Sequence, residues 1–369
     1  MPAVALSHDY LREYGGAERV LAALADIWPA APIVTSVHDP AALPAGFLSG
    51  AEVRASFMQR LPWQRKLWSA YVLLCPLAFA VADVHGYDTL VSSASFAAKA
   101  VRPQRDAAHV CYCHTPPRFL WGYESAHDRS LLPPAARAIL RVVEAALRRQ
   151  DYVAAQAVDV FVANSQTVRA RIRRCYGRES TVVYPPVDTV AWATVAPHSG
   201  DYFLMVSRPG RYKRLDLAVD ACRQAGARLH VVGTTAAEAA AIGVAGGDHV
   251  HYIGRASEAD LRREYAGALA ALYPGEDDFG IVPVEAMAAG KPVLAYGAGG
   301  ALETVLPGVT GELFHPQTPE ALAALLRTFH AGDYDSATCR DRARAFSREA
   351  FDAGMRSIVS TLSSGPASG

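Results

Sequence analysis

The sequence predicts an α/β protein made of two Rossmann-like domains, each with a doubly wound parallel sheet, that face a central cleft. Short runs of β-branched and aromatic residues alternate with longer helical patterns along nearly the whole chain, which is typical of parallel sheets flanked by helices. A segment without periodicity divides these runs into two groups. The 369 residues, 51% of them apolar, are sufficient for two hydrophobic cores.

The runs expected to form strands are short and bounded by turn residues. The first half contains AVAL, PIVTSV, DTLVSS, HVCYC, DVFVAN and TVVY, and the second contains YFLMVS, RLHVVG, VHYIG, ALYP and PVLAY. The linker between the groups is PPVDTVAWATVAPHSGD, which is rich in proline and lacks periodicity. We therefore expect an N-terminal domain at 1–195, a second domain at 196–345, a helix at 346–362 that packs back on the first domain, and a disordered Gly/Ser/Pro-rich tail at 363–369.

Composition excludes several classes of protein. Lysine plus arginine equals aspartate plus glutamate at 36 each, so no polyanion such as nucleic acid is expected as a partner. The six cysteines form no C-x-x-C pair, which argues against zinc and disulfide frameworks and favours a reducing compartment. The longest apolar run, Leu67 to Ala82, is too short to span a bilayer comfortably and contains Pro76. We expect a cytoplasmic protein, with a peripheral position at the inner face of the plasma membrane as a further option.

In the second half, cations follow the run YFLMVS. Arg208 comes directly after it, and Lys213 and Arg214 precede a helical pattern. Cations at a strand end beside a helix N-terminus favour an anion, because fixed charge adds to unpaired backbone N–H groups. A solvated basic turn is the alternative.

An acidic loop, EDDFGIVPVE, follows the run ALYP. Glu276, Asp277 and Asp278 precede Gly280, and Glu285 returns about one turn inside the helix for which Pro283 is a suitable first-turn residue. Capping by Asp277 or Asp278 would explain one acid but not Glu285. Two acids that flank the first N–H groups of a helix would bind a sugar, a diphosphate and a ribose together.

The first half has three notable segments. The pair Gly15-Gly16 lies between a strand and a helix that begins near Ala17, where the backbone could approach a phosphate. His114 ends the run HVCYC and is followed by two prolines; on this residue alone, a structural role is the alternative. Residues 53–82 carry Arg54, Arg60, Arg65 and Lys66, several aromatic residues and no acid. That mixture suits anionic lipid headgroups, and packing of Trp63 and Trp68 into the core is the alternative.

Together these stretches resemble glycosyltransferase family 4, the retaining nucleotide-sugar enzymes of the GT-B fold. The resemblance rests on GEDDFGIVPVEAMAAGKPVLAYGAGGALETV and SRPGRYKRLDLAVDA, supported by YGGAERVL, YCHTPPRFLW and VANSQTVRARIRRCYG. Within the family, HTPPRFLW, RYKRLDLAV and DFGIVPVEAMAAGKPVLAY are similar to bacterial mannosyltransferases that build O-antigen or exopolysaccharide units on a lipid carrier. The resemblance implies transfer of mannose from GDP-mannose to a polyprenyl-diphosphate-linked saccharide, with neither cofactor nor metal. A UDP-sugar-dependent transferase and a nucleotide-sugar epimerase are the alternatives.

The resemblance also assigns residues. It implies that Arg208 and Lys213 neutralise the donor diphosphate, that Glu285 holds the ribose, and that His114 contacts the transferred sugar. Asp277 stands where the family usually has glutamate; Glu276 is adjacent but out of register. The implied catalytic set is His114, Asp277, Arg208 and Lys213. The implied donor-binding set adds Gly15 and Gly16 as a flexible loop, Gly254 and Arg255 near the base, and Asp278, Phe279, Gly280, Ile281, Val282 and Glu285.

Overall fold

The computed structural model describes residues 3–122, 133–193 and 200–363, and it divides into two compact units. Unit 1 is Met1–Tyr184 with Phe351–Gly369, and unit 2 is Pro185–Ala350. The first boundary therefore lies eleven residues before the expected one at 195. The segment after Pro185 belongs to unit 2 because helix α7 (Thr189–Ala193) packs on helix α11 (Ile281–Ala288), and Trp192 meets Tyr265 edge to face at 5.4 Å. Residues 364–369 of the expected tail lie outside the described residues.

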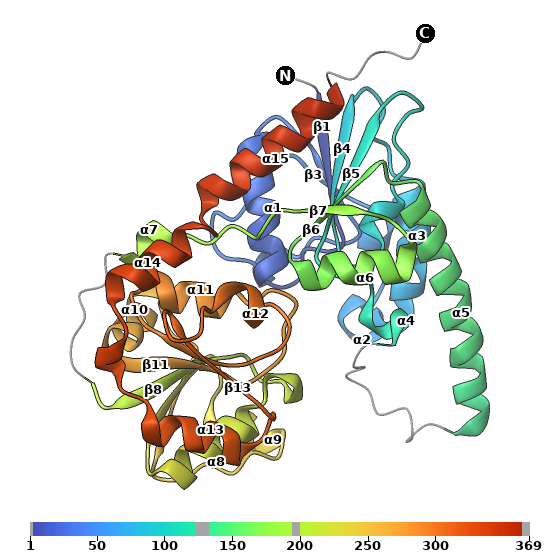
Figure 1. The fold of residues 1–369 in the computed structure, drawn as a ribbon. Coiled ribbons are helices and arrows are strands. Elements are labelled where there is room, and N and C mark those ends of the chain that lie inside the picture. The colour runs from blue at the N-terminus through green and yellow to red at the C-terminus, as the bar shows by residue number, and fades with distance from the viewer. Residues whose placement is uncertain (1–2, 123–132, 194–199, 364–369) are drawn as a thin grey trace. The chain divides into compact units, whose positions relative to one another are not determined.

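Unit 1 contains a seven-stranded parallel sheet of order β3-β2-β1-β4-β5-β6-β7 (Figure 1). Its strands are β1 (Val4–His8), β2 (Ile33–Thr35), β3 (Val53–Ala55), β4 (Thr89–Ala94), β5 (Ala108–Cys113), β6 (Val160–Ala163) and β7 (Ser180–Val182). Its helices are α1 (Gly16–Ile27), α2 (Gln64–Tyr71), α3 (Cys75–Ala80), α4 (Arg118–Trp121), α5 (Pro134–Gln156), α6 (Gln166–Tyr176) and most of α15 (Arg348–Ser363).

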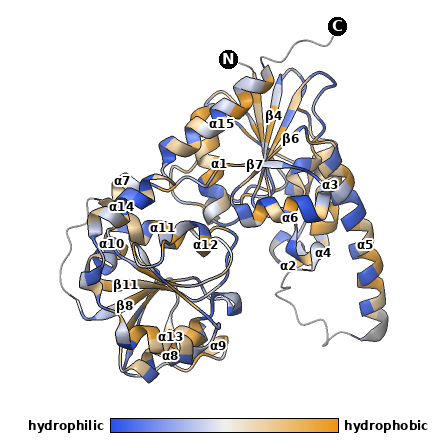
Figure 2. Ribbon diagram, viewed as in Figure 1, coloured by the Kyte–Doolittle hydropathy of each residue, from blue (hydrophilic) through white to orange (hydrophobic). Residues whose placement is uncertain are grey.

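Both faces of this sheet are covered, since successive strand residues point to opposite sides. Leu6 of β1 joins a core with α1 and with Phe351 and Met355 of α15. Ala5 joins the other core, with Phe79 of α3 and Ile172 of α6. The sheet therefore contributes apolar residues to a core on each of its faces, and Figure 2 colours much of the sheet as hydrophobic. Helix α15, the last described helix of the chain, is thus part of the unit 1 core.

Unit 2 contains a six-stranded parallel sheet of order β10-β9-β8-β11-β12-β13. Its strands are β8 (Tyr202–Val206), β9 (Arg228–Val232), β10 (Val250–Gly254), β11 (Ala268–Tyr273), β12 (Val293–Tyr296) and β13 (Gly311–Phe314). Besides α7 and α11, its helices are α8 (Leu215–Ala225), α9 (Ala236–Ala241), α10 (Glu258–Gly267), α12 (Ala301–Thr304), α13 (Pro319–Thr328) and α14 (Ser336–Arg344). Helices α8 and α13 cover one face through a core that includes Leu217, Leu294 and Leu322.

The sequence analysis did not predict the edge strands β3 and β13. Their sequences are VRA and GELF, and only one or two residues in each are fully apolar. An edge strand has one neighbour and remains partly exposed, so its sequence carries a weaker apolar signal than that of a central strand.

Both sheets are doubly wound, and each has a point where the strand order reverses. It lies between β1 and β4 in unit 1 and between β8 and β11 in unit 2. Ligands of such sheets bind beyond the carboxyl ends of the strands at this point. None of the helices in the described part of the chain is long and apolar enough to cross a bilayer.

Candidate functional site

In unit 2, the loops after β8 and β11 bring together a cation and an acid. The Nζ atom of Lys213 lies 2.6 Å from Oδ2 of Asp277, and both side chains are about one-fifth exposed. The hydroxyl of Tyr273, the last residue of β11, donates to the same carboxylate. Burial and the charge of Asp277 raise the pKa of Tyr273 well above its usual value, so the phenol keeps its proton. Glu276 is exposed.

Close backbone packing holds this pair in place. A Cβ atom at Gly275 would lie 2.7 Å from the carbonyl oxygen of Tyr212 and 3.0 Å from Cα of Lys213. Glycine at 275 therefore lets the acidic loop lie directly on the turn that carries Lys213. That turn ends at Arg214, which has a positive φ of 56° and precedes α8.

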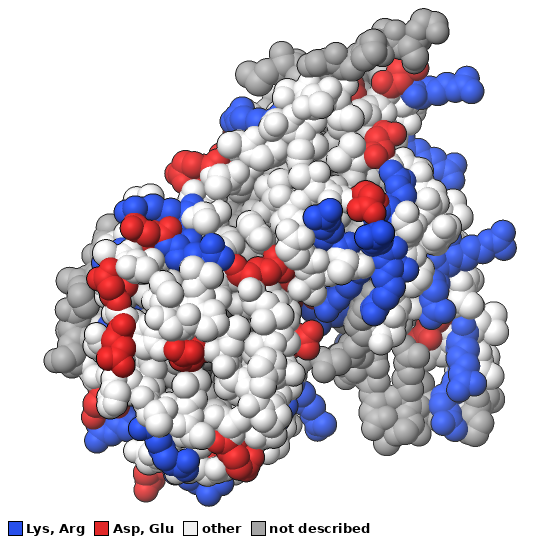
Figure 3. Space-filling view, in the orientation of Figure 1, with Lys and Arg blue, Asp and Glu red and all other residues white. Residues whose placement is uncertain are grey.

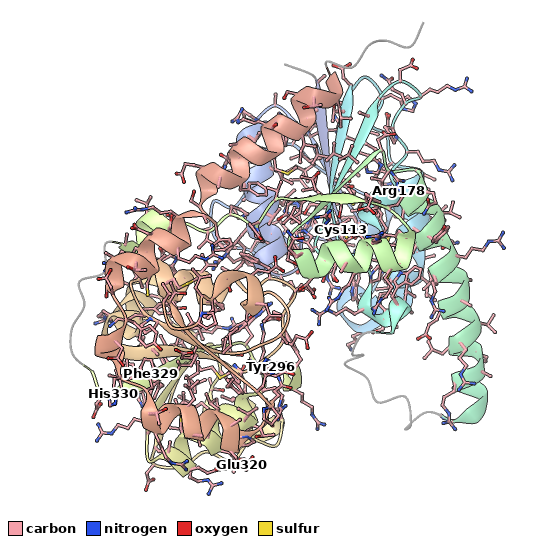
Figure 4. The ribbon with its side chains drawn as sticks, viewed as in Figure 1. Cys113, Arg178, Tyr296, Glu320, Phe329 and His330 are labelled. Atoms are coloured by element: carbon pink, nitrogen blue, oxygen red, sulfur yellow. The ribbon has the colours of Figure 1, made fainter. Side chains whose placement is uncertain are left out.

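The acidic loop is also packed against a second glycine-rich loop, 297–300, which follows β12. The N–H of Gly300 donates to the carbonyl of Asp277 at 2.9 Å, and a Cβ atom at Gly300 would lie 2.0 Å from the carbonyl oxygen of Phe279. Tyr296, labelled in Figure 4, is the last residue of β12 and precedes this loop. The sequence analysis did not select these glycines, although their position after a predicted strand was a usable signal.

Helix α11 begins at Ile281, directly after Gly280 with a positive φ of 81°. Gly280, Ile281 and Val282 therefore supply the first N–H groups of the helix, which have no acceptor within the helix itself. Pro283 contributes no N–H. Glu285 is the fifth helical residue, just past the first turn of α11, and is 4% exposed.

The remaining expected residues of unit 2 lie on the same edge of the sheet. Arg208 is exposed two residues after the end of β8. Gly254 ends β10 with a positive φ of 69°, and its carbonyl accepts from the N–H of Gly233 at 2.6 Å. Arg255 follows and is exposed. Because β10 is two strands from β8 and three from β11, Gly254 and Arg255 lie farther along this edge than the loops that carry Lys213 and Asp277.

In unit 1, His114 follows β5, next to Cys113, which Figure 4 labels. Its Nε2 atom lies 2.8 Å from Oγ of Ser93, and the same hydroxyl oxygen lies 3.1 Å from Nδ1 of His8. His8 in turn places Nε2 3.5 Å from Oε1 of Glu18. Burial, together with His8, lowers the pKa of His114 to about 4, so its ring is neutral at physiological pH.

Glu18 connects this chain of side chains to the glycine pair. Its Oε2 atom accepts from the N–H of Gly15 at 2.8 Å, which caps α1, and α1 begins at Gly16. Burial alone would raise the pKa of Glu18, but the hydrogen bond and charge of His8 outweigh it and lower that pKa. The structure thus joins Gly15 to His114 through Glu18, His8 and Ser93.

The sequence analysis missed His8, Ser93, Glu18 and Asp9. The Asp9 carboxylate accepts from the N–H groups of Ser95, Phe96 and Ala98 at 2.6 to 2.8 Å, and so holds the loop after β4 against the end of β1. The available signals were polar residues directly after a predicted strand in SHDY, and an acid three residues after Gly15 in GGAERV.

Residues 53–82 divide between surface and core. Trp63 is 74% exposed, and Phe57, Leu73, Leu77 and Val81 are exposed with it. Trp68 packs against the core, and the Arg12 guanidinium lies 4.4 Å from its ring centre. The core alternative is therefore correct for Trp68 and wrong for Trp63. In the described ranges, no three His, Cys, Asp or Glu side chains gather closely enough to hold a metal ion.

Comparison with known proteins identifies the family. A model described as Glycosyltransferase Family 4 matches residues 14–190, and one described as Glycosyl transferases group 1 matches residues 188–346. The chain belongs to glycosyltransferase family 4. This glycosyltransferase has the GT-B fold: a cyanobacterial protein, Anabaena Alr3699/HepE in complex with UDP, superimposes with a TM-score of 0.68 at 19% identity, over 97% of this chain and 100% of the other.

Curated relatives match over shorter stretches. The chain is 29% identical over 269 residues to D-inositol 3-phosphate glycosyltransferase of Geodermatophilus obscurus, covering 62% of this chain and 59% of the relative. It is 56% identical over 43 residues to alpha-1,3/1,6-mannosyltransferase ALG2 of Dictyostelium discoideum, covering 12% and 10%. In neither case does the match span two thirds of the relative's length.

Proposed function

We propose that this glycosyltransferase moves mannose from GDP-mannose to a polyprenyl-diphosphate-linked saccharide, with retention of configuration. The observation that carries the proposal is the Lys213–Asp277 pair at the strand-order reversal of unit 2, beside the N-terminus of α11. A nucleoside diphosphate sugar needs cations for its phosphates and acceptors for its hydroxyl groups, and this edge of the sheet carries both.

Cleavage of the glycosyl–phosphate bond places negative charge on the departing diphosphate. Lys213, Arg208 and the first N–H groups of α11 would stabilise that charge, because they are held in place before the reaction. Asp277 and the buried Glu285 would accept hydrogen bonds from hydroxyl groups of the sugar and the ribose. Retention follows if the acceptor hydroxyl attacks on the face that the diphosphate leaves, with a phosphate oxygen taking its proton.

The choice of donor rests on sequence similarity. The match of 56% identity over 43 residues to ALG2, a mannosyltransferase, favours mannose. HepE was solved with UDP, so a UDP-sugar is the competing donor. Thermal-shift measurements with GDP, UDP and ADP separate the two: we expect stabilisation by GDP in the wild type and its loss in Lys213→Ala. Arg223→Ala, an exposed change on α8, is the matched control. Stabilisation by UDP alone would contradict the GDP-mannose assignment.

An epimerase of the same fold is the second candidate, and the acceptor decides between the two. A transferase consumes GDP-mannose and releases GDP in step with a lengthened lipid-linked saccharide. An epimerase releases free nucleotide or sugar at the same rate with no acceptor present. We therefore expect GDP release to depend on added lipid-linked saccharide, and full release without it would support the epimerase.

The lipid-linked acceptor implies contact with the inner face of a membrane, and we propose unit 1 for this contact. Residues 60–81, which contain α2 and α3, expose the apolar side chains of Trp63, Leu73, Leu77 and Val81 and the cations Arg60 and Lys66. Figure 3 shows further basic side chains gathered over α5 and α6, and those of the two helices are all arginines. Apolar side chains flanked by cations suit an anionic lipid surface.

Liposome flotation tests this contact. We expect wild type to float with anionic vesicles more than with neutral ones, and Arg60→Gln/Trp63→Ser/Lys66→Gln to lose that preference. The control Arg223→Gln/Arg228→Gln removes two exposed cations of unit 2. Equal flotation of the wild type and the triple variant on anionic vesicles would contradict the proposal.

A further inference from the structure

The polar chain Glu18–His8–Ser93–His114 is buried at the strand-order reversal of unit 1. Side-chain oxygen and nitrogen atoms follow one another at 3.5, 3.1 and 2.8 Å, and Glu18, His8 and Ser93 are each no more than 5% exposed. Of these four residues, only His114 is among the site residues that the sequence predicts.

Hydrogen-bond counting restricts the protonation states of this chain. The Ser93 hydroxyl has one proton and faces a ring nitrogen on each side, so it can donate to only one of them and must accept from the other. If Ser93 donates to Nδ1 of His8, then Nε2 of His114 must carry a proton and donate to Ser93. If Ser93 donates to His114, then Nδ1 of His8 must carry the proton.

Glu18 determines the charge of His8 in the second arrangement, in which Ser93 donates to His114. Its carboxylate faces Nε2 of His8, and a bare ring nitrogen there would place two lone pairs against each other. Nε2 of His8 therefore carries a proton in both arrangements. It follows that Nδ1 of His8 can carry a proton only when His8 is a cation paired with Glu18. A neutral His8 corresponds to His114 protonated at Nε2, and a cationic His8 to His114 protonated at Nδ1.

We propose that Glu18 and His8 are positioning residues that act through Ser93 to decide which nitrogen of His114 carries its proton. With His8 neutral, Nδ1 of His114 is unprotonated and can accept a hydrogen bond from a sugar hydroxyl. Protonation of His8 turns that atom into a donor and ends the interaction. The contact with a sugar rests on the proposed function; the link between the two histidines rests on the geometry of unit 1 alone.

The other polar and charged groups near these four side chains do not interrupt the hydrogen bonds between His8, Ser93 and His114. Asp9 follows His8, but its carboxylate is held by the three N–H groups of the loop after β4. Tyr112 meets the His114 ring edge-on at 5.4 Å and is a neutral phenol whose hydroxyl donates to the carbonyl of Val183. Tyr10 donates to Glu13, which is exposed. Glu18 is the carboxylate that faces the outer nitrogen of His8.

Nitrogen-15 NMR of histidine-labelled protein tests the link without any substrate. We expect His114 to hold its proton on Nε2 at alkaline pH and to shift toward Nδ1–H in step with the titration of His8. In Ser93→Ala, the state of His114 should no longer follow His8. A His114 tautomer that is independent of His8 in the wild type would overturn the proposal. His114→Gln and His8→Gln assign the two rings.

The pH profile of transfer provides the functional arm. The oxygen of a glutamine at position 18 would accept from the N–H of Gly15 and keep α1 capped, so its amide N–H group would face Nε2 of His8 and that nitrogen would have to be unprotonated. His8 would then be neutral with its proton on Nδ1, Ser93 would donate to Nε2 of His114, and His114 would hold its proton on Nδ1 at every pH. We therefore expect Glu18→Gln to lower kcat at all pH values, whereas Glu13→Gln should keep the wild-type pH profile. Ser93→Ala and Glu18→Gln/Ser93→Ala should share one pH profile.

The NMR and kinetic experiments distinguish a failure of the proposed positioning role from a failure of the proposed function. An equal loss of kcat by Glu18→Gln with and without Ser93, or a Glu18→Gln variant with the wild-type kcat and pH profile, would overturn the positioning role. A coupled titration in the NMR arm, in a protein that transfers no sugar from any nucleotide donor, would uphold the link between the histidines and refute the proposed function instead.

Discussion

Replacement of Lys99 by methionine probes a buried ion pair that supports the unit 1 sheet. Lys99 Nζ lies 2.5 Å from Oδ1 of Asp151, and both side chains are at most 2% exposed. The other carboxylate oxygen accepts from Nε1 of Trp121 and from the hydroxyl of Tyr176, each at 2.8 Å. Burial alone would lower the pKa of Lys99, but the charge of Asp151 raises it, so the lysine remains charged. The pair connects the loop after β4 to α4, α5 and α6.

The expected loss of stability follows from the buried Asp151 carboxylate that Lys99→Met leaves without its cation. Lys99→Met preserves most of the buried volume but removes the only cation paired with Asp151 in the described contacts, and the carboxylate stays buried with two neutral donors. Breaking one side of a buried pair costs about 3–5 kcal/mol. For a unit of about 200 residues this lowers Tm by about 6–20 °C. Lys99→Met/Asp151→Asn removes the stranded charge and keeps an acceptor for Trp121 and Tyr176, so it should recover more than half of the loss.

Differential scanning calorimetry is the suitable assay, because it can resolve the transitions of two units that need not unfold together. The matched control is Arg173→Met, since Arg173 pairs with Glu179 at 3.5 Å with both side chains about three-quarters exposed. An exposed pair contributes at most about 1 kcal/mol. A Tm change in Lys99→Met no larger than that of Arg173→Met would refute the reasoning, as would a double variant less stable than the single one.

Three further outcomes are expected. Lys213→Ala should lower kcat/KM for transfer by about 100-fold or more, because charge stabilisation of a leaving group commonly contributes that much to the rate. Circular dichroism should show that unit 2 is still folded, and near-normal transfer would contradict the proposed site. Gly300→Ala should destabilise unit 2 and weaken donor binding, because the new Cβ would lie 2.0 Å from the Phe279 carbonyl oxygen, whereas Gly332→Ala, with no atom within 4 Å, should change Tm by less than about 2 °C. Burial, with Lys99, lowers the pKa of His109 to about 3, so the folded protein keeps this ring neutral while the unfolded chain protonates it near pH 6.5. Stability should therefore fall as pH drops from about 6.5 toward 3, and His109→Gln should show a shallower fall in urea midpoints; equal slopes would contradict this.

The architecture was predictable because central parallel strands are buried on both faces. Their apolar runs, such as YFLMVS for β8 and PVLAY for β12, are visible in sequence without any partner information. The edge strands and the unit boundary depend on tertiary contacts. Strands β3 and β13 each pair with one neighbouring strand, and Trp192 belongs to unit 2 because α7 packs on α11 and the Trp192 ring meets Tyr265.

The site was predictable where a residue's chemistry is itself unusual. Lys213 and Asp277 stood out as charges at a strand end, and the structure places them in contact. His8, Ser93 and Glu18 did not stand out, because a histidine, a serine and an acid are ordinary residues until parallel pairing sets β1 beside β4 and β4 beside β5. The pairing Ser7↔Ser92 and Ser93↔Tyr112 then brings three distant segments within hydrogen-bonding distance.

The shorter acid at position 277 shows how the chain adjusts a site through its backbone. Aspartate reaches one methylene less far than the glutamate usual in the family, yet its carboxylate contacts both Lys213 and Tyr273. Glycines at 275 and 300 let the loop lie against the Lys213 turn on one side and the 297–300 loop on the other, closer than any residue with a Cβ would allow. Because the loop itself lies close, a shorter side chain is enough, whereas a glutamate in the same backbone would have to fold back to make these contacts. The departure from the family's residue and the glycine packing are therefore two parts of one local solution.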